Sequence, residues 1–503
     1  TFLLISFRIV LKDWAKAGIL SSLIAGLLYS FGHVANALEN WLYSRNIVCN
    51  ISLLAWVWLF IFLILSFLVI RKHRSEKATQ LLNLISGCLL GFTLFAIISI
   101  GDINDELSQD ELNTLGQLRG DPTATNSKSQ KTSSEFPDIY YIILDGYVRS
   151  DYLEEFFGYD NSPFLKELDE RGFYNVSSSR SNYLNTNYSL NTSLNLLNFH
   201  DFPKKIFNKS KYNLHTNYLH DFLQNKGYQT VVFDSGTGAT NDQITDIYIS
   251  TEKATPDNSK GINKFELFFL RTTLGLLLFN NQALENAPDQ PTDLIRSTVN
   301  QELSRRRERI RHALDHLPDY ATQDGHYFLF SHIYLPHIPF LYGPDGEELI
   351  YHGNQNLYWY DVPQENYEEY YNYQIDYLNK AILSTVDQIL SESGRPVVIV
   401  LQADHGDEIY LDRDAPTTQG IEVRSAILNA VYFSDGVYDS LYPTMTPVNT
   451  FRVVLNHWFG TQYPLLPDKV FFHEDTLSTQ INEKPAFIDC CQHFNICLPP
   501  PPN

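Results

Sequence analysis

Three long apolar blocks dominate the first hundred residues of the chain. They cover about Ala17–Leu38, Asn50–Ile70 and Leu81–Ile100, and a shorter apolar block that starts without Met opens the chain. Each long block has roughly 20 residues, the length of helix that crosses about 30 Å of hydrocarbon. Several successive blocks fit a secretory signal peptide poorly. We therefore expect a transmembrane anchor over residues 1–103, with about three full spans and a partial, truncated first one.

Basic residues around these blocks predict the orientation of the anchor. Arg8, Lys12 and Lys16 lie between the opening block and the first long block, and Arg71–Lys77 joins the second long block to the third. Cytoplasmic loops collect Lys and Arg, so both segments are expected inside the cell. Everything after the last span, beginning with the acidic stretch from Gly101, is then expected on the extracytoplasmic side.

Downstream of the anchor the pattern of polar and apolar residues changes twice. A polar, breaker-rich stretch predicts a linker over residues 104–136. From residue 137 to 475, strand-like runs alternate with helix-like stretches, and residues 476–503 form a tail with a Pro-rich end. The strand-like runs are Ile139–Leu144, Tyr228–Phe233, Tyr327–Ile333, Val397–Leu401 and Ala426–Phe433.

The strand-like runs contain few polar interruptions, which is typical of a sheet covered on both faces. Between them, Ser162 is expected to cap a helix with Pro163 in its first turn and Gly172 at its end, and Tyr371–Gly394 has helical apolar spacing. This alternation predicts an α/β domain with a mostly parallel central sheet and helices on both faces.

The net charge and the cysteines indicate which partners and which compartment suit the chain. The net charge of −21 excludes nucleic acid as a partner, because phosphate binding needs a basic surface. Cys49 and Cys88 belong to the membrane part, whereas Cys490, Cys491 and Cys497 cluster near the C-terminus. In an oxidising exterior Cys490 or Cys491 could pair with Cys497, and one cysteine of the three is left over.

Two strand-like runs end in carboxylates. Asp145-Gly146 follows the first run, and Asp404-His405-Gly406 follows the fourth. In parallel sheets the carboxyl ends of the strands meet at one edge, where ligands bind. Carboxylates and an imidazole at the rim of a dry sheet are costly unless a cation offsets them. The two motifs together favour a divalent metal site, although each one alone is also an ordinary turn sequence.

A third candidate is Thr186, which stands just before an expected helix with Leu190, Leu194 and Leu197 along one face. A hydroxyl at a helix N-terminus is well placed to attack phosphorus or sulfur, because the N–H groups there stabilise an anion. The hydroxyl needs a metal or a base for activation. The alternative is that Thr186 only caps the helix.

Two histidines lie at the end of the third strand-like run and just beyond it. His332 and His337 could each bind a metal, hydrogen-bond a phosphate or protonate a leaving group. Pro336 and Pro339 flank His337 and would hold it rigidly in a loop. His332 is an additional candidate, for which an ordinary loop histidine is the alternative.

In their order along the chain, these motifs resemble those of the alkaline phosphatase superfamily. The likeness is to its membrane-anchored, sulfatase-like branch, which includes lipoteichoic acid synthases and phosphoethanolamine transferases. It rests on LDGY after the first strand, a Thr that opens a helix some forty residues later, PHIPF, and DHG after a late strand. It covers the anchor and most of residues 137–475, and near the C-terminus it suggests a structural role for Arg452.

The resemblance implies a role for each candidate. Thr186 would be the nucleophile and would pass through a covalent phospho- or sulfo-threonine. Asp145, Asp404 and His405 would bind one divalent ion that also contacts the Thr186 oxygen. His337 would contact the transferred group or the leaving oxygen. The ion would be zinc, manganese, magnesium or calcium, since an N/O ligand set suits several of these.

The sequence departs from ordinary sulfatases in two places. Those enzymes carry a Cys or Ser, converted to formylglycine, in a C/S-x-P-x-R segment, whereas the segment here is TNYSL. They also often carry adjacent acidic residues after the first strand, whereas Gly146 follows Asp145 here, so one metal ion is favoured over two. Asp407 and Glu408, directly after DHG, receive no role beyond outer or solvent-facing residues.

The expected function is that of a membrane-anchored, metal-dependent hydrolase or transferase of phosphoryl or sulfuryl groups. The expected substrate is a membrane lipid or an envelope glycan of a bacterial cell. A sulfatase is the alternative within the enzyme class, and a catalytically inactive relative that binds an envelope component is the alternative outside it. The sequence decides neither the donor, the acceptor nor the oligomeric state.

Overall fold

The structure is a computed structural model of the chain, which divides into two compact units. It describes residues 2–43, 51–71, 109–121, 136–203, 207, 214, 217–237, 240, 245–251, 290–350, 366–413, 415–473 and 486–502. Each unit is taken by itself below.

The first unit holds the apolar N-terminal helices α1 (Phe2–Leu11), α2 (Trp14–Tyr43) and α3 (Ile51–Arg71). By length and composition α2 and α3 are able to cross a membrane, as the first two long apolar blocks predict, and α1 is a shorter apolar helix. The third long block, Leu81–Ile100, lies outside the described residues.

Helices α2 and α3 run antiparallel. The indole N–H of Trp58 donates to Leu27 O at 3.0 Å, and Lys16 Nζ at the start of α2 donates to Ile70 O at the end of α3, at 2.7 Å. Arg8 lies 5.2 Å from the ring of Trp14, the first residue of α2. Lys16 and Arg71 therefore lie near the same end of the helix pair, and the orientation of the anchor stays a prediction.

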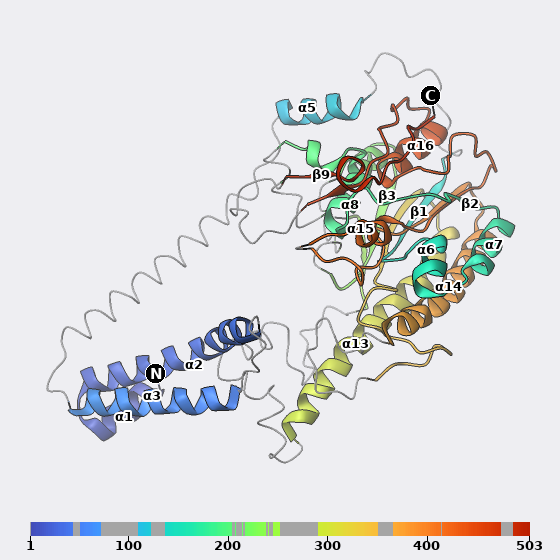
Figure 1. Cartoon of the computed structure of the whole chain (residues 1–503). Coiled ribbons are helices and arrows are strands. Elements are labelled where there is room, and N and C mark those ends of the chain that lie inside the picture. Colours follow the sequence, from blue (N-terminus) through green and yellow to red (C-terminus); the bar gives the residue numbers. More distant parts are fainter. Residues whose placement is uncertain are drawn as a thin grey trace. The chain divides into compact units, whose positions relative to one another are not determined.

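A seven-stranded sheet forms the centre of the second unit (Figure 1). Its strands are β1 (Asp138–Leu144), β2 (Tyr174–Asn175), β3 (Gln229–Phe233), β4 (Ile247–Ile249), β5 (Tyr327–Ile333), β6 (Val397–Gln402) and β7 (Asn429–Phe433), in the order β2-β7-β6-β1-β5-β3-β4. The two pairings of β7, with β6 and with β2, are antiparallel, and the other described pairings are parallel. The predicted α/β fold with a mostly parallel sheet is confirmed.

Strand β1 is central because it pairs with β5 on one side and β6 on the other, and all seven of its residues are buried. Ile139, Tyr141 and Ile143 share one hydrophobic core with residues of α8 (Thr186–Asn195), α10 (Tyr218–Gln224) and α16 (Pro447–Phe459). On the other side of the sheet lie α6 (Ser150–Phe157), α7 (Ser162–Glu170) and α14 (Tyr367–Glu392) (Figure 1). Because helices cover both faces, the strands carry apolar residues at successive positions.

Some predicted helix ends are wrong by a few residues. Helix α7 starts at Ser162, and its N-cap is Asn161, so Ser162 is the first helical residue instead of the cap. Pro163 does occupy the first turn, and Gly172 follows the helix with a positive φ of 86°. Helix α14 begins before the predicted Tyr371. Further helical elements are α13 (Gln290–His316), which belongs to the second unit from Glu302 on, α15 (Thr418–Ser425), η3 (Phe199–Asp201) and η5 (Pro318–Ala321).

The predicted linker, residues 104–136, contains a helix that the sequence pattern did not indicate. In α5 (Gln109–Arg119), Arg119 is buried, and its Nε donates to Asn195 O at the end of α8, at 3.1 Å. The guanidinium carbon of Arg119 also lies 3.4 Å from the ring centre of Tyr218. At least this part of the predicted linker is therefore packed onto the second unit.

The C-terminal tail is also packed. Strand β8 (Phe471–Phe472) pairs with β9 (Ile488–Asp489), and α17 (Cys490–Phe494) follows directly. A disulfide joins Cys491 to Cys497, and Cys490 is free and buried. This resolves the pairing that the sequence left open, whereas Cys49 and Cys88 lie outside the described residues.

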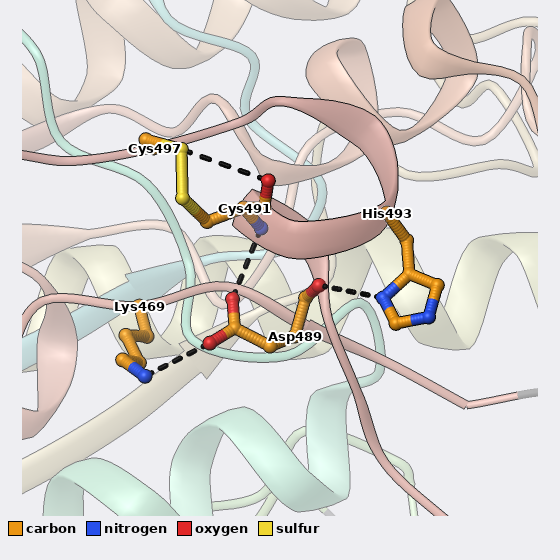
Figure 2. The surroundings of a disulfide bond; sticks show 5 residues. All are labelled: Lys469, Asp489, Cys491, His493 and Cys497. Carbon is orange, nitrogen blue, oxygen red and sulfur yellow. Dashed lines mark hydrogen bonds and ion pairs between the residues drawn. A yellow bond between two sulfur atoms is a disulfide. The ribbon is translucent and has the colours of Figure 1, made fainter.

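Asp489 secures the start of the disulfide loop (Figure 2). Its carboxylate accepts a hydrogen bond from Cys491 N at 3.0 Å and forms an ion pair with Lys469 at 2.8 Å. The side chain thus caps α17 and ties it to the segment before β8.

Candidate active site

Asp145 lies at the carboxyl end of β1, in the centre of the sheet. Its N–H donates to Ile333 O, the last residue of β5, at 3.0 Å, and the carboxylate is buried. Gly146 follows with a φ of 76°, a conformation that suits glycine, and its N–H donates to Asp404 Oδ1 at 3.2 Å. The pairing of β1 with β6 therefore brings the two predicted carboxylates together.

Asp404 and His405 follow β6 and are equally buried. His405 Nε2 lies 3.3 Å from Asp404 Oδ2 and 3.8 Å from Asp145 Oδ1. One donor atom from each of the three residues lies within 4.8 Å of the others. The strand ends thus assemble the three predicted metal ligands at a single point.

The tautomer of His405 follows from its neighbours. Its Nδ1 lies 2.9 Å from Gly406 O, and a carbonyl can only accept, so Nδ1 carries the proton. Burial, and next the charge of Arg424, hold the pKa of His405 well below its usual value. The ring is therefore neutral, and Nε2 presents its lone pair to the site, as a metal ligand must.

Thr186 is the first residue of α8, and its hydroxyl points into this group. Thr186 Oγ1 lies 3.1 Å from His405 Nε2, to which it donates. The cap of α8 is Asn185, whose side chain accepts from Asn187 N at 3.0 Å. The alternative in which Thr186 caps the helix is therefore wrong, and its hydroxyl is oriented towards the strand ends.

The three predicted ligand residues could hold a divalent cation. Among the described residues, the buried oxygens Asp145 Oδ1 and Asp404 Oδ2 have no hydrogen-bond partner. Buried carboxylate oxygens without partners are costly, and a cation between them removes that cost. Two carboxylates and an imidazole form an N/O donor set that several divalent metals accept.

The pKa values of the two carboxyl groups diverge. Burial, together with the charge of Asp145, raises the pKa of Asp404 to about 6. Burial alone would also raise the pKa of Asp145, but His337 and His332 hold it well below its usual value. Asp145 is therefore ionised at any physiological pH, and Asp404 is ionised at neutral pH and above.

His332 stands behind Asp145, outside the three-residue group. It is buried in β5, with Nε2 3.2 Å from Asp145 Oδ2 and Nδ1 3.0 Å from Thr240 Oγ1. Burial lowers its pKa, but the interaction with Asp145 outweighs burial and the net pKa is raised. His332 thus fixes one oxygen of Asp145 and leaves the other directed at the site, an arrangement common behind metal ligands.

His337 lies at the rim of the site and is half-buried. Its backbone N–H donates to Asp145 O at 3.1 Å, and its Nδ1 donates to Ile338 O at 2.7 Å. The ring centres of His337 and His405 are 6.3 Å apart. The imidazole of His337 therefore lies at the edge of the site, near the predicted ligand His405.

Two carboxylates without an assigned role, and an arginine that the sequence did not single out, border the site. Asp407 Oδ2 accepts from the hydroxyl of Tyr367 at 2.8 Å, and Glu408 Oε2 lies 3.4 Å from Arg413 and 3.6 Å from Arg424. Arg424 Nη2 also lies 3.1 Å from His405 Nε2. Arg424 was missed because it is a single arginine in a short helix, where no spacing marks it.

A comparison with protein families identifies the chain. The family described as Sulfatase matches residues 137–458, which is more than half of the chain and contains all of the site residues above. The chain belongs to the sulfatase family. The prediction of a sulfatase-like enzyme is therefore confirmed at the level of the family.

Several solved structures are similar to this sulfatase-family chain. One is the zinc complex of the C-terminal periplasmic domain of EcEptC from Escherichia coli, with 12% identity, a TM-score of 0.42, and coverage of 73% of this chain and 95% of that one. Another is the integral membrane protein lipooligosaccharide phosphoethanolamine transferase A (EptA) from Neisseria meningitidis, with 11% identity, a TM-score of 0.40, and coverage of 89% and 83%. No curated protein matches the chain. At these identities the similarity concerns the fold, and no residue role is taken from it.

Proposed function

We propose that the chain is a membrane-anchored, metal-dependent enzyme that transfers or hydrolyses phosphoryl or sulfuryl groups through Thr186. One observation carries the proposal. The Thr186 hydroxyl, at the N-terminus of α8, lies 3.1 Å from His405 Nε2, beside two buried carboxylate oxygens that lack partners among the described residues. A nucleophile, a helix N-terminus and a cation site at one point are the parts that group transfer to an anionic centre requires.

The proposed reaction has two steps. In the first, the Thr186 hydroxyl gives its proton to solvent, and its Oγ1 forms a bond to the phosphorus or sulfur of the donor while the bond from that atom to the leaving oxygen breaks with its electron pair. His337 is placed to give a proton to the leaving oxygen. In the second step, the oxygen of water or of an acceptor hydroxyl attacks the phosphorus or sulfur of the threonine ester. The bond from that atom to Thr186 Oγ1 breaks with its electron pair, and the proton lost by the attacking hydroxyl replaces the one that Thr186 gave up.

The other residues prepare these steps. Asp145, Asp404 and His405 would hold one divalent ion, which when bound supplies positive charge that favours the ionised hydroxyl and offsets the charge of the transferred group. Zinc is the ion in the E. coli EcEptC structure, and manganese, magnesium and calcium also suit the donor set. The first N–H groups of α8 add partial positive charge on the same side.

The proposed substrate is a membrane lipid or an envelope glycan on the extracytoplasmic side of a bacterial membrane. Helices α2 and α3 are able to span a membrane, and an anchored domain meets substrates that lie at its surface. EptA, a structure similar to this chain, is named as a lipooligosaccharide phosphoethanolamine transferase. In the proposed organisation, residues 1–103 are the anchor, 104–136 the linker, 137–475 the catalytic domain and 476–503 the tail.

The test compares Thr186→Ala with Thr186→Ser in the full chain, purified in detergent with added zinc or manganese. Thr186→Ala is expected to lower turnover of an aryl phosphodiester by at least about 10³-fold and to abolish a covalent adduct seen by mass spectrometry. Thr186→Ser keeps the hydroxyl and is expected to form the adduct. Full activity of the alanine variant would contradict the proposal.

A sulfatase remains the second candidate, because the matching family is described by that name. The same site could transfer a sulfuryl group, since its geometry does not distinguish phosphorus from sulfur. Turnover of an aryl sulfate, without turnover of an aryl phosphate or phosphodiester, would favour it. A chain that binds no metal and turns over none of the three would instead be the inactive, binding relative.

A further inference from the structure

Arg424 lies between the two segments that carry the proposed nucleophile and the proposed ligand His405. It is 3% exposed and belongs to α15. Its Nε donates to Leu184 O at 3.2 Å, two residues before Thr186, and its Nη1 donates to Gly406 O at 2.9 Å, directly after His405. One guanidinium therefore bonds the backbone of both segments.

A third contact joins the same guanidinium to the centre of the site. Arg424 Nη2 lies 3.1 Å from His405 Nε2, the atom that is also 3.1 Å from Thr186 Oγ1. Glu408 Oε2 lies 3.6 Å from Nη2 and forms an ion pair with it. The planar fork of an arginine fixes several acceptors at set angles, which the single ammonium of a lysine does not do.

We propose that Arg424 is a positioning residue that holds the segment before Thr186 and the loop of His405 in the arrangement needed for metal binding and attack. The inference rests on the proposed function. Two of the three contacts go to backbone carbonyls, so they do not depend on what His405 Nε2 binds. Arg424 acts through Thr186 and His405 and needs no contact with substrate.

Arg180 provides a matched control, because it is a second largely buried arginine bonded to α15. Its Nη1 donates to Ser425 Oγ at 2.8 Å and to Glu422 O at 3.0 Å, and its Nη2 donates to Tyr152 OH at 2.8 Å. None of these groups belongs to the three-ligand cluster or to α8. If arginines in this region only stabilise α15, replacement of either one should have the same effect.

The experiment titrates zinc and manganese separately into the chelator-treated full chain, by calorimetry. Arg424→Lys is expected to weaken metal binding about 10- to 100-fold, the usual effect of losing a residue that orients a ligand, and Arg180→Lys by less than about threefold. With metal at saturation, Arg424→Lys should lower kcat for an aryl phosphodiester and leave KM unchanged. A merely structural arginine would not separate kcat from KM in this way.

The outcomes are distinct. A wild-type chain that binds metal together with an Arg424→Lys variant of equal affinity and kcat overturns the inference alone. Equal losses in Arg424→Lys and Arg180→Lys also overturn it, because they show a general effect on α15. A wild-type chain that binds neither metal overturns the proposed function together with the inference.

A second variant applies if Arg424→Lys unfolds more than about 5 °C below the wild type. Glu408→Gln leaves Arg424 in place but removes the carboxylate that holds Nη2. It is expected to weaken metal binding in the same direction by about threefold or more. An unchanged affinity in this variant would overturn the inference.

Discussion

Gly406, the last residue of the DHG motif, is closely surrounded by backbone, so adding a side chain there directly perturbs the site. A Cβ at this position would lie 2.1 Å from Val423 O, 3.0 Å from Ala426 O and 3.2 Å from Arg424 O. The Gly406 N–H also donates to Arg424 O at 2.6 Å. All three crowded atoms are backbone carbonyl oxygens, so a side-chain rotation cannot relieve the overlap.

The size of the effect of Gly406→Ala follows from these distances. Real Cβ atoms essentially never approach closer than 3.0 Å, so the segments must separate by at least about 0.9 Å, the difference between 3.0 and 2.1 Å. Such overpacking costs about 1–3 kcal/mol of folding stability. Because His405 is the neighbouring residue, a shift near 1 Å should also lower turnover about 10²-fold.

Gly394, which follows α14, is the matched control. A Cβ there meets no heavy atom within 4 Å, and its φ is not in the left-handed region. Gly394→Ala should therefore be neutral or stabilise the chain by about 0.4–1 kcal/mol. Urea unfolding and aryl phosphodiester turnover are measured on both variants. A Gly406→Ala variant with wild-type stability and rate would refute the reasoning, because the His405 loop would then not be held against residues 423–426.

Three further predictions concern the tail, the core and the pH dependence. Cys491→Ser opens a loop with a sequence separation of 6 and should cost about 2 kcal/mol in urea unfolding, an effect that a reductant should reproduce in the wild type. Arg452→Met should cost about 3 kcal/mol or more, because Arg452 is fully buried and donates to the carbonyls of Arg119, Pro464 and Leu196, which would lose their donor. Zinc affinity is measured between pH 5 and 8. It should fall about tenfold per pH unit below about pH 6, because the raised pKa of Asp404 lets a proton compete with the metal there. Above pH 7 Asp404 is ionised, so its protonation should no longer lower the zinc affinity.

The central strands were predictable because they are buried on both faces. Every residue of β1, β5 and β6 is buried, and their apolar runs stand out against the polar segments around them. Strands β2 and β4 were missed because they have two and three half-buried residues at the edges of the sheet, too few to set a pattern. The reversed direction of β7 was equally unpredictable, since a buried strand reads the same in either direction.

Some residues of the candidate site could be predicted from the sequence and others could not. Asp145, Asp404 and His405 could be predicted because they follow buried apolar strands, where a charged or polar group is costly without a partner. Arg424 was not found, because two of its three hydrogen bonds go to backbone carbonyls, which every residue carries. Arg119 in α5 was missed for the same reason, since its partner is the carbonyl of Asn195. A hydrogen bond from a side chain to a distant backbone carbonyl requires no particular residue at the position that carries the carbonyl, so the sequence does not reveal it.

The acidic residues around the DHG motif differ in one respect that bears on the proposed mechanism. Asp407 accepts hydrogen bonds from Tyr367 and from the N–H of Ile409, and Glu408 lies beside two arginines. The protein thus neutralises or hydrogen-bonds these two carboxylates itself. For Asp145 and Asp404, one buried oxygen each has no hydrogen-bond partner among the described residues, and these two oxygens lie 3.8 and 3.3 Å from His405 Nε2. Because the burial of an ionised carboxylate without a partner is costly, the proposed cation belongs between Asp145 and Asp404 and not at the acidic residues that follow.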